Sequence, residues 1–526
     1  MFPIITVAII STIIYALHHL IIQPLFLSPL HHIPGPKLYA LTKWRLAYED
    51  LRGRRTRTIH DLHLHYGPAI RIGPSEIHFN SLAALRSIYG AGSAFGRTGF
   101  YRMFDVYGCQ NLFTFHSGKE HAERKKLLAH AYSKSAILRG PGAEMIEEKI
   151  GTFMEMLGRE KGTACEVFKS LHYYSLDTIT AFLYGDGFGG TAAMEGNLKD
   201  RALLDDILRD PDRRRLTWFA THLPGLTAWL YALNQYAVFK PLVRPLLPMK
   251  PPTTYTAIRN HALQSYQRFE ASKHGNSISS ETHPTIMTRL YASHPSQNPS
   301  TSPLSSLSIA SELADHLLAG ISTTADTLTF LLFQLSLPAN AAIQERLVKE
   351  VRSLPPSALT VNGEPDTRVP SLSTADNLPI FNAIVKETLR LFAPLPASEP
   401  RVCFSASPTV DGYRIPSGTV VGMQPYSLHR EEAVFREPEV WRPERWLEEG
   451  RSSEMERWWW AFSSGARGLA TAEMALVPAI YGKYRTRVKA GFEGVSPGCT
   501  SRFEVFHDER FGKVEEHTCW LDFIEK

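Results

Sequence analysis

Apolar residues recur at helical spacing along most of this chain, and the longest unbroken pattern runs from Ser308 to Leu337. An apolar residue at every third or fourth position marks the buried face of a helix. The same spacing predicts helices at His116–Ser135, Phe381–Pro396 and Leu469–Val488. Pro478 should kink or shorten the last of these, because proline lacks a backbone N–H and clashes with the preceding turn.

Strand patterns are confined to short segments. Tyr66–Phe79 predicts two strands joined at a turn made by Gly73 and Pro74. Ser398–Cys403 and Asp411–Val421 predict further strands around a turn. We therefore expect a mainly α fold with small β-sheets.

The N-terminal segment Met1–Pro36 contains no Lys, Arg, Asp or Glu. Its apolar run of about 24 residues would be roughly 36 Å long as a helix, which is enough to cross a bilayer. A secretory signal peptide is the alternative, but the basic start and the small-residue cleavage site are missing. Lys37, Lys43 and Arg45 follow at once and indicate that the next domain is cytoplasmic. We expect an anchor and proline-rich hinge over residues 1–36 and one large domain over 37–526.

Composition places only weak limits on the class of protein and on its partners. Apolar residues make up 44% and charged residues 21% of the chain, which is ordinary for a globular protein with a large core. The net charge of +5 comes from scattered basic residues, so nucleic acid is not an expected partner. The widely spaced cysteines indicate neither a disulfide framework nor a zinc site, and they fit a reducing environment. They are Cys109, Cys165, Cys403, Cys499 and Cys519.

The segment Pro211–Pro252 is unusually aromatic for its proline content. It predicts either an exposed apolar patch, for membrane contact or substrate entry, or ordinary core helices. Ser293–Ser308 is rich in Ser and Pro and should be a flexible surface loop.

Four short motifs follow one another along the chain. Ala319–Thr324 reads A-G-I-S-T-T, and Glu387 with Arg390 forms E-x-x-R on one helical face. About 55 residues later comes P-E-R-W, which contains Arg445. The last motif is F-x-x-G-x-R, made by Phe462, Gly465 and Arg467, and it is followed by L-A-x-x-E at Leu469–Glu473.

These motifs, in this order and spacing, resemble those of the cytochrome P-450 superfamily, the haem-thiolate monooxygenases. The resemblance implies a mainly helical fold around a buried haem b, preceded by one N-terminal transmembrane helix. It also implies insertion of one oxygen atom from O2 into a small lipophilic substrate. Electrons would come from NADPH through a membrane-bound cytochrome reductase. The chain looks most like fungal secondary-metabolism members, in the endoplasmic reticulum membrane, single-pass, with the catalytic domain cytoplasmic.

The middle of the haem-loop motif is missing here. The family pattern is F-x-x-G-x-R-x-C-x-G-x-x-L-A-x-x-E, in which the cysteine thiolate binds iron. Phe462 to Glu473 is eleven steps, where the family has sixteen. The economical interpretation is a lost segment, C-x-G-x-x, between Gly468 and Leu469, so no metal ligand is assigned.

The resemblance implies roles for the A-G-I-S-T-T residues. Gly320 would let a ligand approach the helix backbone, and Thr323 would help to deliver protons to dioxygen. Ser322 stands where the family usually has an acid, so the proton relay would be altered. Asp326 lies three residues further along and should face another direction.

Haem propionates would be bound by cationic side chains. Arg467 belongs to the family motif, and Arg401 is a second candidate. His121 and Lys125 keep the spacing of the family's W-x-x-x-R motif with changed residue types. For Arg124 and Lys126 we expect a solvated basic face. Glu387, Arg390 and Arg445 would form a buried structural triad, in which losing one member typically costs about 3–5 kcal/mol.

The missing thiolate leaves two hypotheses. In one, the encoded enzyme is a normal monooxygenase, and an error in defining the gene has removed five residues. In the other, the protein is a membrane-anchored pseudoenzyme that binds a ligand or partner without oxygen chemistry. An oxygen-independent rearrangement is a third option, suggested by Ser322, but it also needs an iron ligand.

Overall fold

The computed structural model describes residues 2–116, 118–159, 164–185, 187–208, 210–247, 256–274, 285–293, 304–355, 359–361, 368–404, 407–448, 450, 452–462, 472–501 and 504–525. Within these ranges the chain is mainly helical with small sheets, as the sequence predicts. The expected flexible loop lies mostly outside them, as do Gly465, Arg467 and the junction of Gly468 with Leu469.

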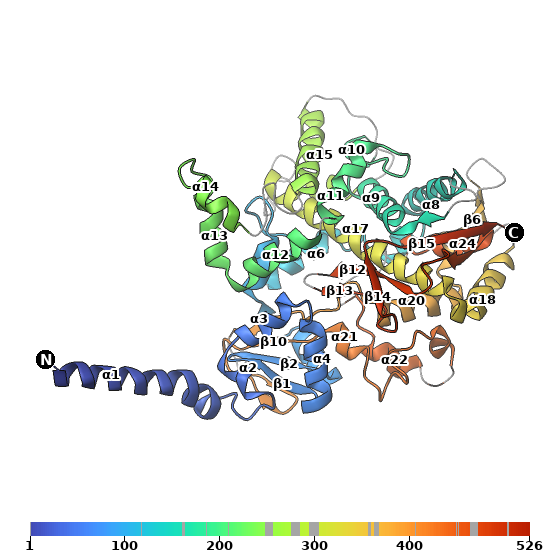
Figure 1. Cartoon of the computed structure of the whole chain (residues 1–526). Helices are drawn as coiled ribbons and strands as arrows, with labels where there is room; N and C mark the ends of the chain where they lie inside the picture. Colours follow the sequence, from blue (N-terminus) through green and yellow to red (C-terminus); the bar gives the residue numbers. More distant parts are fainter. Residues whose placement is uncertain are drawn as a thin grey trace.

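The body of the molecule is built around one long helix, α17 (Ser306–Ser336), which crosses its middle (Figure 1). Ser305 caps the start of this helix by accepting a hydrogen bond from the Ser308 backbone N–H. The helix ends before Pro338, which disfavours helical geometry at the preceding residue. The predicted helix at Ser308–Leu337 is thus confirmed.

Other helices pack around α17, and α9 contacts it most extensively. A glycine at positive φ, Gly185, ends α9, as is usual at a helix C-terminus. The main surrounding helices are α4 (Arg55–Tyr66), α6 (Gly118–Leu128), α8 (Pro141–Arg159), α9 (Val167–Tyr184), α12 (Asp210–His222), α15 (Thr256–His274), α18 (Ala341–Arg352) and α20 (Pro379–Leu391).

A five-stranded sheet of order β1-β2-β10-β7-β3 forms the second part of the body. Its strands are β1 (Ala69–Gly73), β2 (Glu76–Phe79), β3 (Phe95–Arg97), β7 (Arg401–Cys403) and β10 (Val420–Gly422). Ile70 and Ile72 join one hydrophobic cluster, and Ala69 joins another, because side chains alternate between the two faces of a strand. The predicted strands around the Gly73 turn are confirmed.

The C-terminal segment forms two three-stranded sheets, β11-β15-β4 and β13-β12-β14. Their strands are β4 (Cys165–Glu166), β11 (Tyr484–Val488), β12 (Val495–Ser501), β13 (Glu504–Phe506), β14 (Lys513–Glu516) and β15 (Trp520–Glu525). The predicted helix at Leu469–Val488 is therefore wrong at its end, where β11 stands. Of the predicted range, the structure describes residues 472–488, in which 472–473 and α24 (Leu476–Lys483) are helical, and Pro478 lies in the first turn of α24.

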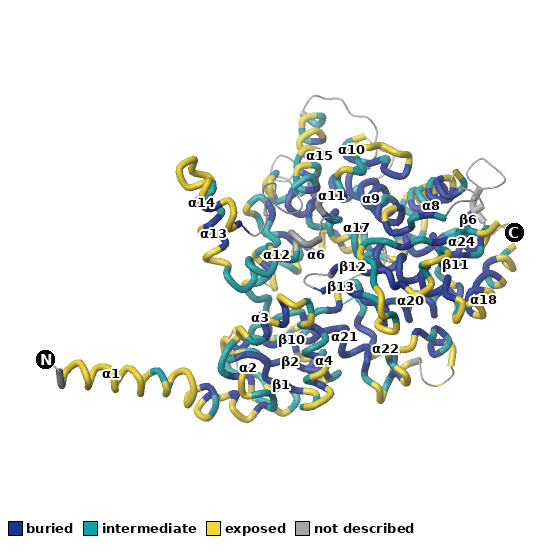
Figure 2. The backbone as a smooth tube through the Cα atoms, in the orientation of Figure 1, coloured by how far each residue is buried: buried dark blue, intermediate teal, exposed yellow. Residues whose placement is uncertain are grey.

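Two apolar segments project from the body (Figures 1 and 2). The first is α1 (Phe2–Leu17) with the π-helix η1 (His18–Leu27), of which residues 4–27 have mean hydropathy 2.1. The second is α13 (Pro224–Leu233) with α14 (Lys240–Val243), where Trp229, Val238 and other apolar residues are exposed. Ordinary core helices were the alternative for this segment, and the exposure excludes them for α13 and α14.

Candidate active site

An accessible strip interrupts the buried surface of α17 at its centre. Ala319 is exposed and Gly320, Ser322 and Thr323 are half-buried, whereas most of the following turns are fully buried. Thr323 Oγ1 donates a hydrogen bond of 2.7 Å to the Ala319 carbonyl oxygen, one turn back. The role of Thr323 in proton delivery stays a prediction.

Gly320 faces the neighbouring helix α9. A Cβ atom at this position would lie 2.6 Å from Ile179 Cγ1 and 2.8 Å from Ile179 Cδ1. Any larger residue would therefore push the two helices apart. Close packing with α9 is the contact that the structure gives to this glycine, and its role in the approach of a ligand stays a prediction.

Thr324, beside Thr323, reaches a buried carboxyl group. Its Oγ1 donates a hydrogen bond of 2.7 Å to Glu473 Oε2, while Glu473 Oε1 has no hydrogen-bond partner among the described residues. Glu473 is 1% exposed, and this burial raises its pKa to about 8 despite the bond from Thr324. A protonated carboxyl group therefore lies behind α17 at neutral pH.

Asp326 faces away from the accessible strip, as the sequence predicts. Its carboxylate Oδ1 lies 3.8 Å from His172 Nε2 on α9, and both side chains are buried. Asp326 therefore does not replace the acid that is missing at Ser322.

Two arginines meet at the edge of the five-stranded sheet. The register of β3 with β7 pairs Arg97 directly with Arg401. Arg401 Nη1 donates a hydrogen bond of 2.5 Å to the Tyr101 hydroxyl, and its Nη2 lies 3.3 Å from Glu399 Oε2. The pKa of Arg97 is lowered by burial and then by the charge of Arg401. Like charges directly opposite each other on two strands are destabilising unless an anion lies between them.

His121 approaches this pair from α6, and Lys125 lies one turn further along that helix. Burial first, and then the charges of Arg97 and Lys125, lower the pKa of His121. Lys125 is exposed. The expectation of a solvated face is wrong for Arg124, which is 6% exposed and forms an ion pair with Glu312 on α17.

These residues fit the propionate groups of the implied haem. Arg97 and Arg401 form a partly buried pair of cations that two propionates would neutralise through charge-assisted hydrogen bonds, and the neutral His121 ring beside them could donate an N–H. Sequence reasoning missed Arg97, because only the strand register brings it beside Arg401.

The residues of the haem loop do not fit the iron of the implied haem. No cysteine occurs between Cys403 and Cys499, so the chain supplies no thiolate at the loop that begins at Phe462. Phe462 packs edge-on against Trp459 at a ring distance of 5.8 Å. Cys499 is buried, and burial raises its thiol pKa well above the ordinary range, so it is no substitute.

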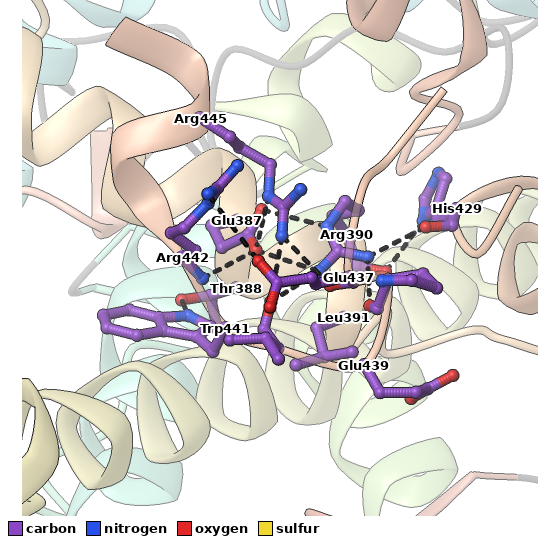
Figure 3. Close-up of polar contacts among 12 residues, drawn as sticks. Glu387, Thr388, Arg390, Leu391, His429, Glu437, Glu439, Trp441, Arg442 and Arg445 are labelled. Carbon is purple, nitrogen blue, oxygen red and sulfur yellow. Dashed lines mark hydrogen bonds and ion pairs between the residues drawn. The ribbon is translucent and has the colours of Figure 1, made fainter. Parts of the chain in front are cut away.

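The structural triad forms where the motifs predict it (Figure 3). Arg390 donates to both oxygens of Glu387 at 2.9 Å, and Arg445 Nε donates to Glu387 Oε1 at 3.0 Å. All three side chains are at most 1% exposed. Burial opposes ionisation of Glu387, but Arg390 and then Arg445 outweigh it and hold the pKa below its usual value.

The remaining donors of the triad are satisfied by backbone. Arg390 Nη1 donates to the carbonyl oxygens of His429 and Pro438, and Arg445 Nη1 donates to that of Arg436. Trp446 Nε1 completes the shell by donating to Glu387 Oε2 at 3.0 Å. The network therefore holds the loop 429–446 against α20, which is a structural role.

Comparison with known proteins places this architecture in a family. The profile of the family described as Cytochrome P450 matches residues 34–477. The chain belongs to the cytochrome P450 family. The match covers the accessible strip of α17, the arginine pair and the triad.

Several fungal P450 proteins are similar along most of their length. The chain is 28% identical to the cytochrome P450 monooxygenase hkm5 of Aspergillus hancockii over 473 residues, covering 87% of this chain and 84% of the relative. It is also 28% identical to the monooxygenase stcB of Emericella nidulans, with 87% and 82% covered. The monooxygenase cypX of Dothistroma septosporum is 28% identical, with 85% and 81% covered. The assignment is thus to monooxygenases, a group of oxidoreductases that use haem iron and electrons from a redox partner.

Proposed function

We propose that this P450 inserts one oxygen atom from O2 into a small lipophilic metabolite of a fungal biosynthetic pathway. The observation that carries the proposal is the accessible strip of α17, where Thr323 hydrogen-bonds to the Ala319 carbonyl group. The fungal monooxygenase relatives support the reaction class. The active form would include the segment C-x-G-x-x between Gly468 and Leu469.

In this proposal some residues bind the haem, and others position groups for the reaction with dioxygen. Arg97, Arg401 and His121 would hold the haem propionates, and Phe462, Gly465 and Arg467 would frame the loop beneath the haem. When bound through a thiolate, haem supplies the electron-rich iron that activates dioxygen. Thr323 would hold a proton at its hydroxyl oxygen, with Ser322 beside it in place of an acid.

Electron supply and location follow from the surface of the chain. We infer that residues 4–27 cross the endoplasmic reticulum membrane once, since this segment is long and apolar, and none of its apolar 18-residue window is buried. The basic residues from Lys37 onward favour a cytoplasmic catalytic domain. A membrane-bound NADPH–cytochrome reductase would then reach it in the same plane, with electrons passing to the haem.

The first test is to sequence the transcript across the codons for Arg467 to Glu473. Five extra codons that include a cysteine would make the protein an ordinary monooxygenase. Insertion of C-x-G-x-x after Gly468 should then give the carbon monoxide absorption band of thiolate-bound haem, and the same insertion with serine for cysteine should not. A folded, haem-loaded protein without that band would contradict the proposal.

A second candidate function is a pseudoenzyme of the same fold. The observation that favours it is the combination of an intact buried triad with a chain that has no thiolate at the haem loop. A transcript that matches the present sequence would support this candidate. The protein would then bind a lipophilic ligand or partner without oxygen chemistry.

A further inference from the structure

A cavity of about 200 Å³ lies between the end of α20 and the C-terminal sheet β13-β12-β14. Its walls come from Leu391 and Phe392, from the loop 429–446, and from residues 507–510, which join β13 to β14. None of the residues that line it belongs to the accessible strip of α17, the arginine pair or the triad. Sites for drug-sized ligands measure roughly 300–1,000 Å³, so this cavity fits a smaller molecule.

Arg430 supplies N–H donors to the cavity, and its side chain is only 4% exposed. Its Nε donates to Glu439 Oε1 at 2.8 Å, Nη2 donates to the Leu391 carbonyl oxygen at 3.1 Å, and Nη1 donates to the Tyr426 carbonyl oxygen at 3.4 Å. A guanidinium carries five N–H groups, so two N–H groups of this buried cation have no acceptor among the described residues. An anionic group in the cavity would supply the missing acceptors.

Arg510 supplies a second set of donors and connects the cavity to α17. Its Nε donates to Asp508 Oδ1 at 2.9 Å, and its Nη2 donates to Asp508 Oδ2 and, at 3.0 Å, to Gln334 Oε1 on α17. Its Nη1 has no hydrogen bond within the part of the chain that the structure describes. Helical rise places Gln334 about 17 Å along α17 from Thr323. The cavity is therefore separate from the candidate active site, although the same helix borders both.

Two carboxylates supply acceptors to the same cavity. The side chains of Glu439 and Glu509 are 50% and 41% exposed, so solvent and ligands can reach them. Glu509 Oε1 accepts from Arg57 Nε at 2.8 Å and from the Tyr426 hydroxyl at 3.0 Å. The Oε2 atom of each glutamate has no hydrogen bond to a described residue. Burial opposes ionisation of Glu509, but Arg57 outweighs it and lowers the pKa, so this acceptor is charged at neutral pH.

Three further residues of the cavity wall are uncharged. Leu391 and Phe392 are buried and apolar, and the Phe392 ring stacks on Phe330 of α17 at a centroid distance of 4.4 Å. Burial first, and then the charge of Arg57, lower the pKa of His507, so its ring is neutral at pH 7. One small cavity thus combines cationic donors, anionic acceptors and an apolar surface.

We propose that this cavity binds a free α-amino acid with an apolar side chain. The ligand carboxylate would accept hydrogen bonds from the two arginines, and the ligand ammonium would donate to the two glutamates. A ligand with only one of these charges would leave the other groups unbonded and would meet charges of its own sign. The ligand side chain would lie against Leu391 and Phe392. The inference goes beyond the proposed function, because it assigns a second ligand site that needs no haem.

The test is calorimetry at neutral pH on the full chain in phosphatidylcholine nanodiscs. The probes are L-leucine, L-methionine and L-phenylalanine, each compared with the acid that lacks its ammonium group and the amine that lacks its carboxylate. At least one amino acid should bind about tenfold or more tightly than both of its single-charge counterparts. The double variant Glu439→Gln, Glu509→Gln should lose this preference, because neither amide attracts the ammonium group as a carboxylate does. Glu444→Gln changes a carboxylate that is also 41% exposed and ion-paired, but lies outside the cavity wall, so it should bind as before.

Three outcomes would overturn the inference. They are no binding of any of the three amino acids, equal binding of an amino acid and its single-charge counterparts, and a preference that survives in the double variant. The urea unfolding midpoint of the double variant shows whether it is folded, and both altered side chains are half-exposed, so it should stay close to that of the unaltered chain. Because binding is measured without turnover or haem, the result is separate from the carbon monoxide test.

Discussion

At the scale of single residues, Glu473 is the unusual group of the site. It is buried against α17, with one carboxyl oxygen bonded to Thr324 and the other without a partner among the described residues. A buried carboxyl group with one donor is more stable as the neutral acid. Glu473 lies behind Thr323 and Thr324, so its charge changes the electrostatic potential at the whole candidate site.

Glu473 should make the protein less stable as pH rises. The folded-state pKa of about 8 lies above the ordinary value of 4.5, so the folded protein binds the proton more tightly than the unfolded chain does. This contribution is fully present below pH 4.5 and is lost between pH 4.5 and pH 8. Glu473→Gln should remove that dependence and raise the free energy of unfolding at pH 8 by about 4 kcal/mol.

Urea unfolding at pH 5 and at pH 8 measures the effect. At pH 5 the two proteins should be similar, because the glutamine oxygen still accepts the bond from Thr324. The exposed Glu123→Gln variant should show little difference at either pH. Equal stabilities of Glu473→Gln and the unaltered chain at pH 8 would rule out a neutral Glu473.

At the scale of elements, the packing of α9 on α17 depends on Gly320. Gly320→Ala should destabilise the protein by about 1–2 kcal/mol, because overpacking against Ile179 outweighs the better helix propensity of alanine. In α8, Gly158 has no atoms within 4 Å of an added Cβ, so Gly158→Ala is the matched control and should be neutral or stabilising.

A double-mutant cycle identifies the contact. Ile179→Ala alone should cost about 2–5 kcal/mol through the cavity that it leaves. Combined with Gly320→Ala, the new methyl group enters that cavity, so the double variant should lose less than the two single variants together. Strict additivity in thermal unfolding would mean that the two residues are not in contact.

The sequence predicted elements well where their pattern is local. The helix at Ser308–Leu337 and the turn at Gly73 follow from spacing and from proline and glycine positions. The strand at Tyr484–Val488 was mistaken for helix, because its partner β15 is distant in sequence. The same holds for the candidate site. Local motifs predict the triad, whereas the partners of Arg97 and Arg124 could not be predicted because they are brought together only by tertiary contacts.

At the scale of the whole molecule, two apolar surfaces are exposed together. One is the N-terminal helix, and the other is the surface of α13 and α14 with Trp229, Tyr236, Val238, Phe239 and Leu242. Both are drawn as exposed in Figure 2 and project toward the same side of the view. Exposed apolar groups of this size are typical of membrane contact.

The anchor is also bonded to the body. The buried Arg71 guanidinium donates 2.8 Å to the Pro24 carbonyl oxygen and also contacts the Ser28 hydroxyl. The Arg71 backbone N–H donates to the Pro34 carbonyl oxygen at 2.7 Å. A deletion that ends before Pro24 should therefore leave the body intact, whereas one that removes Pro24 and Ser28 takes two acceptors from a buried cation and leaves it the carbonyl oxygens of Gly73 and Pro74.

We predict that a chain lacking residues 2–17 still binds phosphatidylcholine–phosphatidylserine vesicles through α13 and α14. Replacing Trp229 and Phe239 by serine in that chain should lower the vesicle partition coefficient by at least about tenfold, because two apolar side chains leave the bilayer. Leu198→Ser changes a more exposed apolar residue, on α10 (Leu198–Arg201); it is the control and should bind as before. If the shortened chain floats with vesicles regardless of Trp229 and Phe239, another surface faces the membrane, and the orientation inferred for the catalytic domain must change with it.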